Sequence, residues 1–284
     1  MGKKTSKKLR GNAAGRQTKK PRGKPNSSSS GDRAWGDTEV NIVLGCANRC
    51  RYCFARTAAK RFGRIRADDD WGTTYHRLKK GKDYKSGECY GTVRFPTTHD
   101  ITPDFLESCV AVMQKLLAGG NDVIVCSKPR LECIKRLCAE FADNLANIEF
   151  RFTVGAMDDA ILRFWEPGAS NFQERLNCLK YAFRKGFKTS VNIEPMLDAP
   201  NVSELFHRLV PYVNVFINIG IMKRVGQNVR PRSRREKAEV RKIKENQSPN
   251  RIRSIYEVLK GKPLVRWSPE TKRILAVEKE AACK

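Results

Sequence analysis

Three cysteines lie within eight residues of one another, in the stretch Cys46-Ala47-Asn48-Arg49-Cys50-Arg51-Tyr52-Cys53. A loop this short can direct three thiolates at one metal centre, but it supplies no fourth. A structural zinc site is closed by four protein ligands. Three thiolates leave one coordination position open, and this arrangement suits an iron–sulfur cluster that must also bind another molecule.

The elements that must position this loop follow a regular pattern. An apolar run at 40–44 precedes the loop and a helix-like stretch follows it, which is the opening of a βα unit. Six strands alternating with helices predict a parallel sheet with right-handed crossovers. The pattern predicts strands at 39–44, 91–95, 122–126, 148–154, 187–193 and 213–220, and helices at 54–62, 103–117, 130–145, 171–185 and 202–210.

The cysteine spacing, with Tyr52 just before the last cysteine, resembles the signature of the radical S-adenosylmethionine (SAM) superfamily. The nearer resemblance is to its spore photoproduct lyase-like group, and it extends over residues 39–220. It implies an α/β fold in which the sheet curls into a partial (β/α)6 TIM-like barrel. Besides the loop, it is carried by Thr97-Thr98-His99-Asp100, Ser127-Lys128-Pro129 and Asn192-Ile193-Glu194-Pro195.

The resemblance also implies the cofactors. Cys46, Cys50 and Cys53 would hold a 4Fe-4S cluster, and SAM would chelate the fourth iron. One electron, from a donor such as flavodoxin or ferredoxin, would cleave SAM to a 5′-deoxyadenosyl radical that abstracts hydrogen from a substrate. The protein's part is then to position and shield the cofactor.

In barrels of this kind the reactive site lies at the carboxyl ends of the strands. The resemblance and these positions predict a SAM site in which Thr97 and Thr98 receive the amino group and Lys128 pairs with the carboxylate. Thr153 or Glu194 would bond the ribose, and the backbone of Tyr52 would face the adenine.

Six of the remaining cysteines fall into two groups. Cys126, beside the predicted SAM site, is the candidate catalytic residue, as a hydrogen or thiyl partner, although core packing is the simpler interpretation. Lyases of the group carry a hydrogen-donor cysteine at the end of the second strand, where this chain has Thr97 and Thr98. This departure argues against the lyase reaction itself but not against radical SAM chemistry. Five others lie in apolar patterns and are expected to be buried: Cys89, Cys109, Cys133, Cys138 and Cys178.

Polar residues alternate with apolar ones along several predicted strands. Glu149, Arg151 and Thr153 share one face of their strand. Fully buried parallel strands normally read as continuous apolar runs. The alternation predicts a polar, ligand-holding barrel interior, and it is equally compatible with interior ion pairs among Arg94, Glu149, Arg151 and Glu194.

The net charge of +26 is concentrated in residues 1–33, 56–85 and 223–253. Such basic segments attract polyanions, so nucleic acid is the expected partner. The pattern predicts a disordered tail at 1–33, a partial barrel at 34–222 and a basic arm and extension at 223–284. Within the last of these, 223–253 should be a flexible arm or a helix exposed on all sides, while 255–259 and 264–267 pack back as a helix and a strand.

Residues 63–90 form a long polar insertion in which Trp71, Tyr75, Tyr84 and Tyr90 alternate with cations. These aromatics either stack on bases or anchor the insertion. No apolar run is long enough to span a membrane, and the N-terminus lacks the apolar core of a signal peptide. With cysteines spread through apolar segments, the sequence predicts a reducing, cytoplasmic location and no membrane partner.

Together these features favour a radical SAM enzyme that acts on a nucleic acid or nucleotide. The alternative is a non-catalytic nucleic-acid-binding protein whose cysteine loop is a structural metal site. An enzyme acting on a peptide or small metabolite, with basic segments serving localisation, also stays open.

Overall fold

The structure is a computed structural model that describes residues 38–76 and 91–282. Its centre is a seven-stranded sheet in which every neighbouring pair is parallel, in the order β1-β4-β5-β6-β7-β8-β9. The strands are β1 (Thr38–Glu39), β4 (Thr92–Phe95), β5 (Asp122–Ser127), β6 (Ile148–Thr153), β7 (Lys188–Ile193), β8 (Ile217–Ile219) and β9 (Val265–Trp267).

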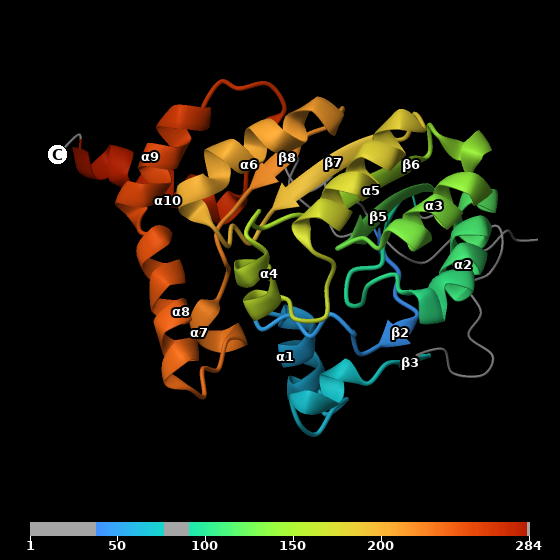
Figure 1. The fold of residues 1–284 in the computed structure, drawn as a ribbon, viewed down its shortest axis with the longest axis horizontal. Coiled ribbons are helices and arrows are strands. Elements are labelled where there is room, and N and C mark those ends of the chain that lie inside the picture. The colour runs from blue at the N-terminus through green and yellow to red at the C-terminus, as the bar shows by residue number, and fades with distance from the viewer. Residues whose placement is uncertain (1–37, 77–90, 283–284) are drawn as a thin grey trace, which may run out of the picture.

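Four helices run along the outer face of this sheet (Figure 1). They are α2 (Leu106–Ala118), α3 (Leu131–Glu140), α5 (Phe172–Arg184) and α6 (Val202–Leu209). Helix α3 buries Cys133, Ile134, Leu137 and Cys138, which recur at helical spacing on one side and join the hydrophobic core. The chain order of strand, crossover helix and parallel strand confirms the predicted α/β partial barrel.

The predicted first strand at 39–44 is divided. After β1 the chain leaves the sheet because the Asn41 side chain turns to the end of β4, where its Oδ1 accepts hydrogen bonds from the backbone N–H groups of Thr97 and Thr98 at 2.8 Å each. The second half, β2 (Val43–Leu44), pairs antiparallel with β3 (Tyr75–His76). The prediction of one continuous strand at 39–44 was therefore wrong. The break in it allows the cysteine loop to reach across the strand ends.

Helix α1 (Phe54–Arg61) follows the loop, as predicted, and has its own small core. This core consists of two helix residues and two that follow the helix: Ala55, Ala59, Ile65 and Trp71. Trp71, 2% exposed, therefore anchors the insertion and cannot serve as a stacking platform. The short 3-10 turn Asp69–Gly72 holds it in place.

The C-terminal region is more ordered than the sequence suggested. Between β8 and β9 the chain forms α7 (Val225–Asn228), α8 (Arg234–Asn246) and α9 (Pro249–Leu259). The prediction of a flexible arm, or of a helix exposed on all sides, is wrong because Val229 and Ile243 are buried in the main core. Helix α8 begins with a reciprocal capping box between Ser233 and Glu236.

The helix and strand predicted after 253 are confirmed as part of α9 and as β9, which pairs with β8. Outside the 223–253 segment, two helices were not predicted, α4 (Asp159–Trp165) and α10 (Pro269–Ala282). Within the part of the chain that the structure describes, no helix combines the length and apolar character needed to cross a membrane. The predictions for the 1–33 tail, Tyr84, Cys89 and Tyr90 lie outside the described residues.

Candidate active site at the strand ends

The cysteine loop lies beyond the carboxyl ends of the strands, between the sheet and α1 (Figure 1). Backbone hydrogen bonds fix it on two sides, from Cys46 N to Trp71 O at 2.8 Å and from Arg51 N to Trp165 O at 2.8 Å. Gly168 N also donates to Asn48 O at 3.0 Å. A Cβ at Gly168 would stand 2.0 Å from Ala47 O, so this close approach requires glycine.

The three thiols of the loop lie close enough to influence one another. Burial, followed by nearby Asp100 and Cys53, raises the pKa of Cys46 to about 12. Burial likewise raises the pKa of Cys50 well above its ordinary value, while Lys128 opposes the shift. In the described residues no three His, Cys, Asp or Glu side chains, these cysteines included, are already gathered in metal-coordinating geometry.

This donor set fits an iron–sulfur cluster better than a closed cage. It consists of three thiols from one anchored loop, and thiols lose their protons and come together as a metal binds. The backbone anchors hold the loop in place for that step, so Cys46, Cys50 and Cys53 are the side chains that would hold the cluster.

Asp100 joins the loop to the sheet. Its buried carboxylate accepts hydrogen bonds from Asn48 Nδ2 at 2.6 Å and from the backbone of Lys128 and Ile101 at 2.9 and 2.8 Å. The Ser127 hydroxyl donates to it as well. One side chain after β4 therefore fixes both the loop and the end of β5.

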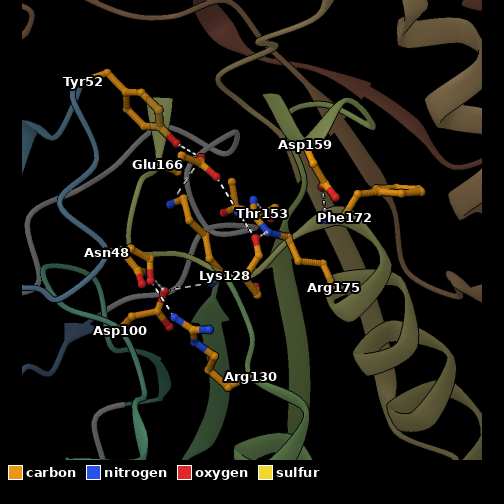
Figure 2. A network of polar contacts seen from close by, with 12 residues as sticks. Asn48, Tyr52, Asp100, Lys128, Arg130, Thr153, Asp159, Glu166, Phe172 and Arg175 are labelled. Atoms are coloured by element: carbon orange, nitrogen blue, oxygen red, sulfur yellow. Dashed lines mark hydrogen bonds and ion pairs between the residues drawn. The ribbon is translucent and has the colours of Figure 1, made fainter. Parts of the chain in front are cut away.

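A second buried network lies next to the first (Figure 2). The Glu166 carboxylate pairs with Arg175 Nη2 at 2.6 Å and lies 4.0 Å from Lys128 Nζ, and it accepts a hydrogen bond from the Tyr52 hydroxyl. Arg175 also donates to Thr153 O at 3.2 Å and to Ser170 O at 2.7 Å. Figure 2 shows the Lys128 side chain extending from the Asp100 side toward Glu166.

The charges of this network determine its protonation. Burial alone would lower the pKa of Lys128, but Cys50, Glu166 and Asp100 outweigh it and raise the pKa. Burial alone would raise the pKa of Glu166, but Arg175 and Lys128 outweigh it and lower the pKa. Burial and Glu166 raise the pKa of Tyr52. The site therefore presents a protonated ammonium, beside a neutral phenol, to the cysteine loop.

The structure places the predicted SAM residues in three groups. Tyr52, Lys128 and the backbone of Thr153 belong to the Glu166 network. Thr97 and Thr98 bond Asn41, and Thr97 Oγ1 also donates to Glu39 at 3.0 Å.

Glu194 makes up the third group by itself and lies apart from the other two. It accepts from Asn218 Nδ2 at 2.8 Å and pairs with Lys223 Nζ at 2.9 Å, and Lys223 in turn pairs with Glu270 at 3.0 Å. The individual SAM-binding roles stay predictions.

Cys126 differs from the other cysteines described outside the loop. Cys109, Cys133, Cys138 and Cys178 are in the hydrophobic core, as expected. Cys126 is partly exposed and lies opposite Arg151 in the β5–β6 register. Burial raises its pKa to about 11, although Arg151 and Arg94 oppose the shift. Its catalytic role stays a prediction.

The sequence analysis gave no role to several site residues, although some lie in the motifs or strand ends that it singled out: Asn41, Asn48, Asp100, Glu166 and Arg175. One carried a signal. Arg175 interrupts the apolar side of α5 between Phe172 and Leu179, and it is fully buried there. A charged residue on the buried face of a helix needs a buried partner, so it pointed to an acid such as Glu166. Asn48 and Asn41 lie in irregular backbone, for which periodicity gives no indication.

A basic groove opens beside the loop. It is lined on one side by Arg51 and on the other by the segment leading into α8, with Phe164 between them. Arg51 Cζ stands 4.7 Å and Arg235 Cζ 5.6 Å from the Phe164 ring centroid, and Arg51 pairs with Glu236 at 2.5 Å. We call this feature the arginine groove, and its cations are Arg51, Arg56, Arg163, Arg230, Arg232 and Arg235.

Comparison with known proteins gives a family and a fold. A family model described as the radical SAM superfamily matches residues 40–205. A solved mutant of spore photoproduct lyase, with bound AdoMet and dinucleoside spore photoproduct, is 13% identical with a TM-score of 0.52, over 86% of this chain and 78% of that chain. Another mutant of that lyase is 16% identical with a TM-score of 0.50, over 89% and 81%. The comparison with curated proteins gives no match.

Proposed function

We propose that this chain, which belongs to the radical SAM superfamily, holds a 4Fe-4S cluster on Cys46, Cys50 and Cys53 and uses it on a nucleic acid or nucleotide. The chain is a radical SAM enzyme, and the cofactors of its family are the cluster and SAM. When bound, these cofactors supply the one-electron cleavage of SAM to a 5′-deoxyadenosyl radical. The observation that carries the proposal is a three-thiol loop anchored at the strand ends beside the half-buried ammonium of Lys128.

The protein's own residues have defined tasks in this proposal. Asp100 holds Asn48 and thereby fixes the loop relative to the sheet. Lys128, kept protonated by its neighbours, offers a cation to the carboxylate of SAM. Glu166 and Arg175 hold the Lys128 ammonium and the Tyr52 phenol in place from behind. These fixed polar groups in a buried site need no rearrangement when the ligand binds.

The arginine groove supports a polyanionic substrate. Six arginines line the groove, compared with three acids, Asp68, Asp69 and Glu236. One of these arginines, Arg51, is a residue of the cysteine loop. A phosphate backbone would replace water around these guanidinium groups, and Phe164 gives an aromatic surface among them. The lyase structure that shares this fold holds a dinucleoside, which is consistent with such a substrate.

The first test concerns the cluster. Protein reconstituted without oxygen should hold about four irons per chain and should cleave SAM under dithionite. Cys50→Ala should lose the cluster and this cleavage, whereas Cys138→Ala, which alters a cysteine of the hydrophobic core, should keep both. Undiminished SAM cleavage by Cys50→Ala, or tight zinc with no cleavage by the wild type, would overturn the proposal in favour of a structural metal loop.

The second test concerns the substrate. Deuterium from labelled oligonucleotides should appear in 5′-deoxyadenosine if hydrogen is abstracted from nucleic acid. Binding to single-stranded DNA and RNA should weaken steeply with salt. The variant Arg230→Gln/Arg232→Gln/Arg235→Gln should bind at least tenfold more weakly, while Arg136→Gln on α3 should not. A flat salt response would contradict a nucleic-acid substrate and favour a small or peptide substrate.

A further inference from the structure

Helix α1 exposes an aromatic stripe to solvent. Phe54 and Phe62 are 59% and 64% exposed, and they are two of the four large hydrophobic side chains exposed in the part of the chain described. Phe54 and Ala58 are four residues apart, and the C-cap residue Phe62 follows Ala58 at the same interval, so the three lie along one side of the helix and its end. Singly scattered apolar residues need no explanation, but an aligned aromatic pair is typical of an interaction surface.

The surroundings of this stripe are strongly basic. Between positions 46 and 70 the chain has seven Arg or Lys residues and three Asp, at 68–70, of which Asp68 pairs with Lys60 at 3.2 Å, so the segment keeps an excess of positive charge. The guanidinium carbons of Arg61 and Arg64 stand 5.7 and 5.6 Å from the Phe62 ring centroid. An apolar centre with a cationic rim is complementary to a protein surface of opposite charge, which it also attracts over long range.

The stripe begins next to the predicted cluster. Cys53 is the N-cap of α1 and its Sγ accepts a hydrogen bond from Arg56 N at 3.4 Å, so exposed Phe54 is one peptide bond away from a cluster ligand. Other residues of the loop, Asn48 and Tyr52, point instead to the buried networks of the strand ends (Figure 2). The loop therefore joins an inner side, where SAM and substrate belong, to an outer side at α1 (Figure 1).

We propose that the stripe Phe54-Ala58-Phe62, with Arg61 and Arg64, is the docking surface for an acidic one-electron carrier protein of the flavodoxin or ferredoxin class. The inference rests on the proposed function, because only a redox cluster needs such a carrier. One electron passes from the carrier's reduced flavin or iron–sulfur centre to the oxidised cluster. No bond forms or breaks and no proton crosses the interface, and the carrier leaves oxidised by one electron.

A nucleic acid is also acidic and also stacks on aromatics. The position of the stripe favours the carrier, because a substrate must bring its reacting atom to the inner side of the loop. An electron needs only a short path to the cluster, and α1 offers one through its N-cap residue.

The test compares Phe54→Ser/Phe62→Ser with the wild type and with Val258→Ser, which removes an equally exposed side chain, 56% accessible, from α9. Binding of oxidised flavodoxin and ferredoxin to the reconstituted, cluster-loaded protein is measured by fluorescence anisotropy at several salt concentrations. Cluster reduction is followed by stopped flow with each reduced carrier and, separately, with dithionite.

We expect the double variant to lose at least tenfold in carrier binding and in carrier-driven reduction, to reduce normally with dithionite, and Val258→Ser to match the wild type. Equal carrier binding by variant and wild type, or binding of neither carrier to the wild type, overturns the docking surface. Loss of single-stranded DNA binding alone in the variant assigns the stripe to nucleic acid and also overturns it. Failure of the proposed function appears separately, as the absence of a cluster that dithionite can reduce in the wild type.

Discussion

The barrel interior has a polar cluster toward each end, and the two are built differently. Toward the amino ends of the strands, Arg151 bonds Glu149 at 2.8 and 2.9 Å and Ser190 at 3.2 Å. The Phe216 ring lies 4.8 Å from Arg151 Cζ and 4.2 Å from Arg266 Cζ. At the carboxyl ends, Lys128 Nζ stands 4.0 Å from its nearest paired carboxylate, that of Glu166, beyond hydrogen-bond range.

This difference in pairing distinguishes a charge that stabilises the fold, at Arg151, from a charge that is available to a ligand, at Lys128. Arg151 is 1% exposed and lies directly against a carboxylate and an aromatic face. Lys128 is 17% exposed, faces the cysteine loop and is supported from behind by Glu166. The polar residues at the amino ends of the strands therefore serve the fold, and those at the carboxyl ends serve ligand binding. Substitutions should affect stability at the amino ends and cofactor binding at the carboxyl ends.

Arg175→Met should have the largest effect on stability. Removing this guanidinium leaves the Glu166 carboxylate, which has no exposed side-chain surface, without its closest cationic partner. Breaking a buried pair in this way costs about 3–5 kcal/mol of unfolding free energy. Urea denaturation of cluster-free protein measures the loss.

Two controls accompany this variant. Glu166→Gln/Arg175→Met, which removes both charges, should recover part of the lost stability. Arg136→Met, which removes a guanidinium from an exposed ion pair with Glu107, should unfold like the wild type. A loss from Arg175→Met no greater than that from Arg136→Met would show that the Glu166 network is not a desolvated ion pair.

Arg151→Met should cost less, about 2–3 kcal/mol, because the abandoned Glu149 carboxylate keeps 13% of its surface in water. The comparison between the amino-end and carboxyl-end clusters also predicts how this variant should function. Iron content and dithionite-driven SAM cleavage should stay at wild-type levels in the folded variant, since Arg151 belongs to the amino-end cluster. If iron content fell instead, the two clusters would be one functional unit.

Asp100→Asn tests the carboxyl end with a smaller change. In the variant an amide NH2 group takes the place of Oδ2, which accepts hydrogen bonds from Asn48 Nδ2 and Lys128 N. Because an NH2 group cannot accept from these donors, about 1–2 kcal/mol of hydrogen bonding is lost. Because Asn48 is part of the cysteine loop, the reduced cluster should also show an altered electron paramagnetic resonance spectrum. Asn147→Asp, a change of the same size in a hydrogen bond to Asp122 remote from the loop, is the control and should keep the wild-type spectrum.

The sequence predicted the features that follow local rules. Alternating apolar and helical periods located most of the strands and helices, and cysteine spacing identified the loop. The missed features depend on contacts distant in sequence. Asn41 breaks the first strand by bonding residues 56 and 57 positions later, which no local pattern records.

The basic C-terminal segment shows the same limit. Its composition favoured an arm, yet a few apolar residues attach it to the core, with Val229, Ile243 and Ile252 buried there. Glu166 was given no role because its partners Tyr52, Lys128 and Arg175 lie on other segments of the chain, which no local pattern records. Arg175 alone gave a usable signal, as a charge on a buried helical stripe.

The smallest predicted effect is a difference in pH dependence between two buried carboxyl groups. Because Arg175 and Lys128 outweigh burial, the pKa of Glu166 is lowered on folding. Its contribution to stability is therefore complete above the ordinary carboxyl pKa of about 4.3 and is lost as the pH falls through the folded value. Burial raises the pKa of Asp100, despite the opposing Lys128. Its contribution is complete below the ordinary Asp pKa and is lost as the pH rises through the folded value.

The two substitutions should thus change the pH profile in opposite directions. Between about pH 5 and 3, where ordinary carboxyls titrate, Glu166→Gln should lose less stability on acidification than the wild type, and Asp100→Asn should lose more. Urea denaturation of cluster-free protein across this range gives the slopes. Parallel slopes in all three proteins would mean that the ion pairs of Glu166 do not compensate for its burial, and Lys128 would then lack the fixed counter-charge on which its availability to a ligand depends.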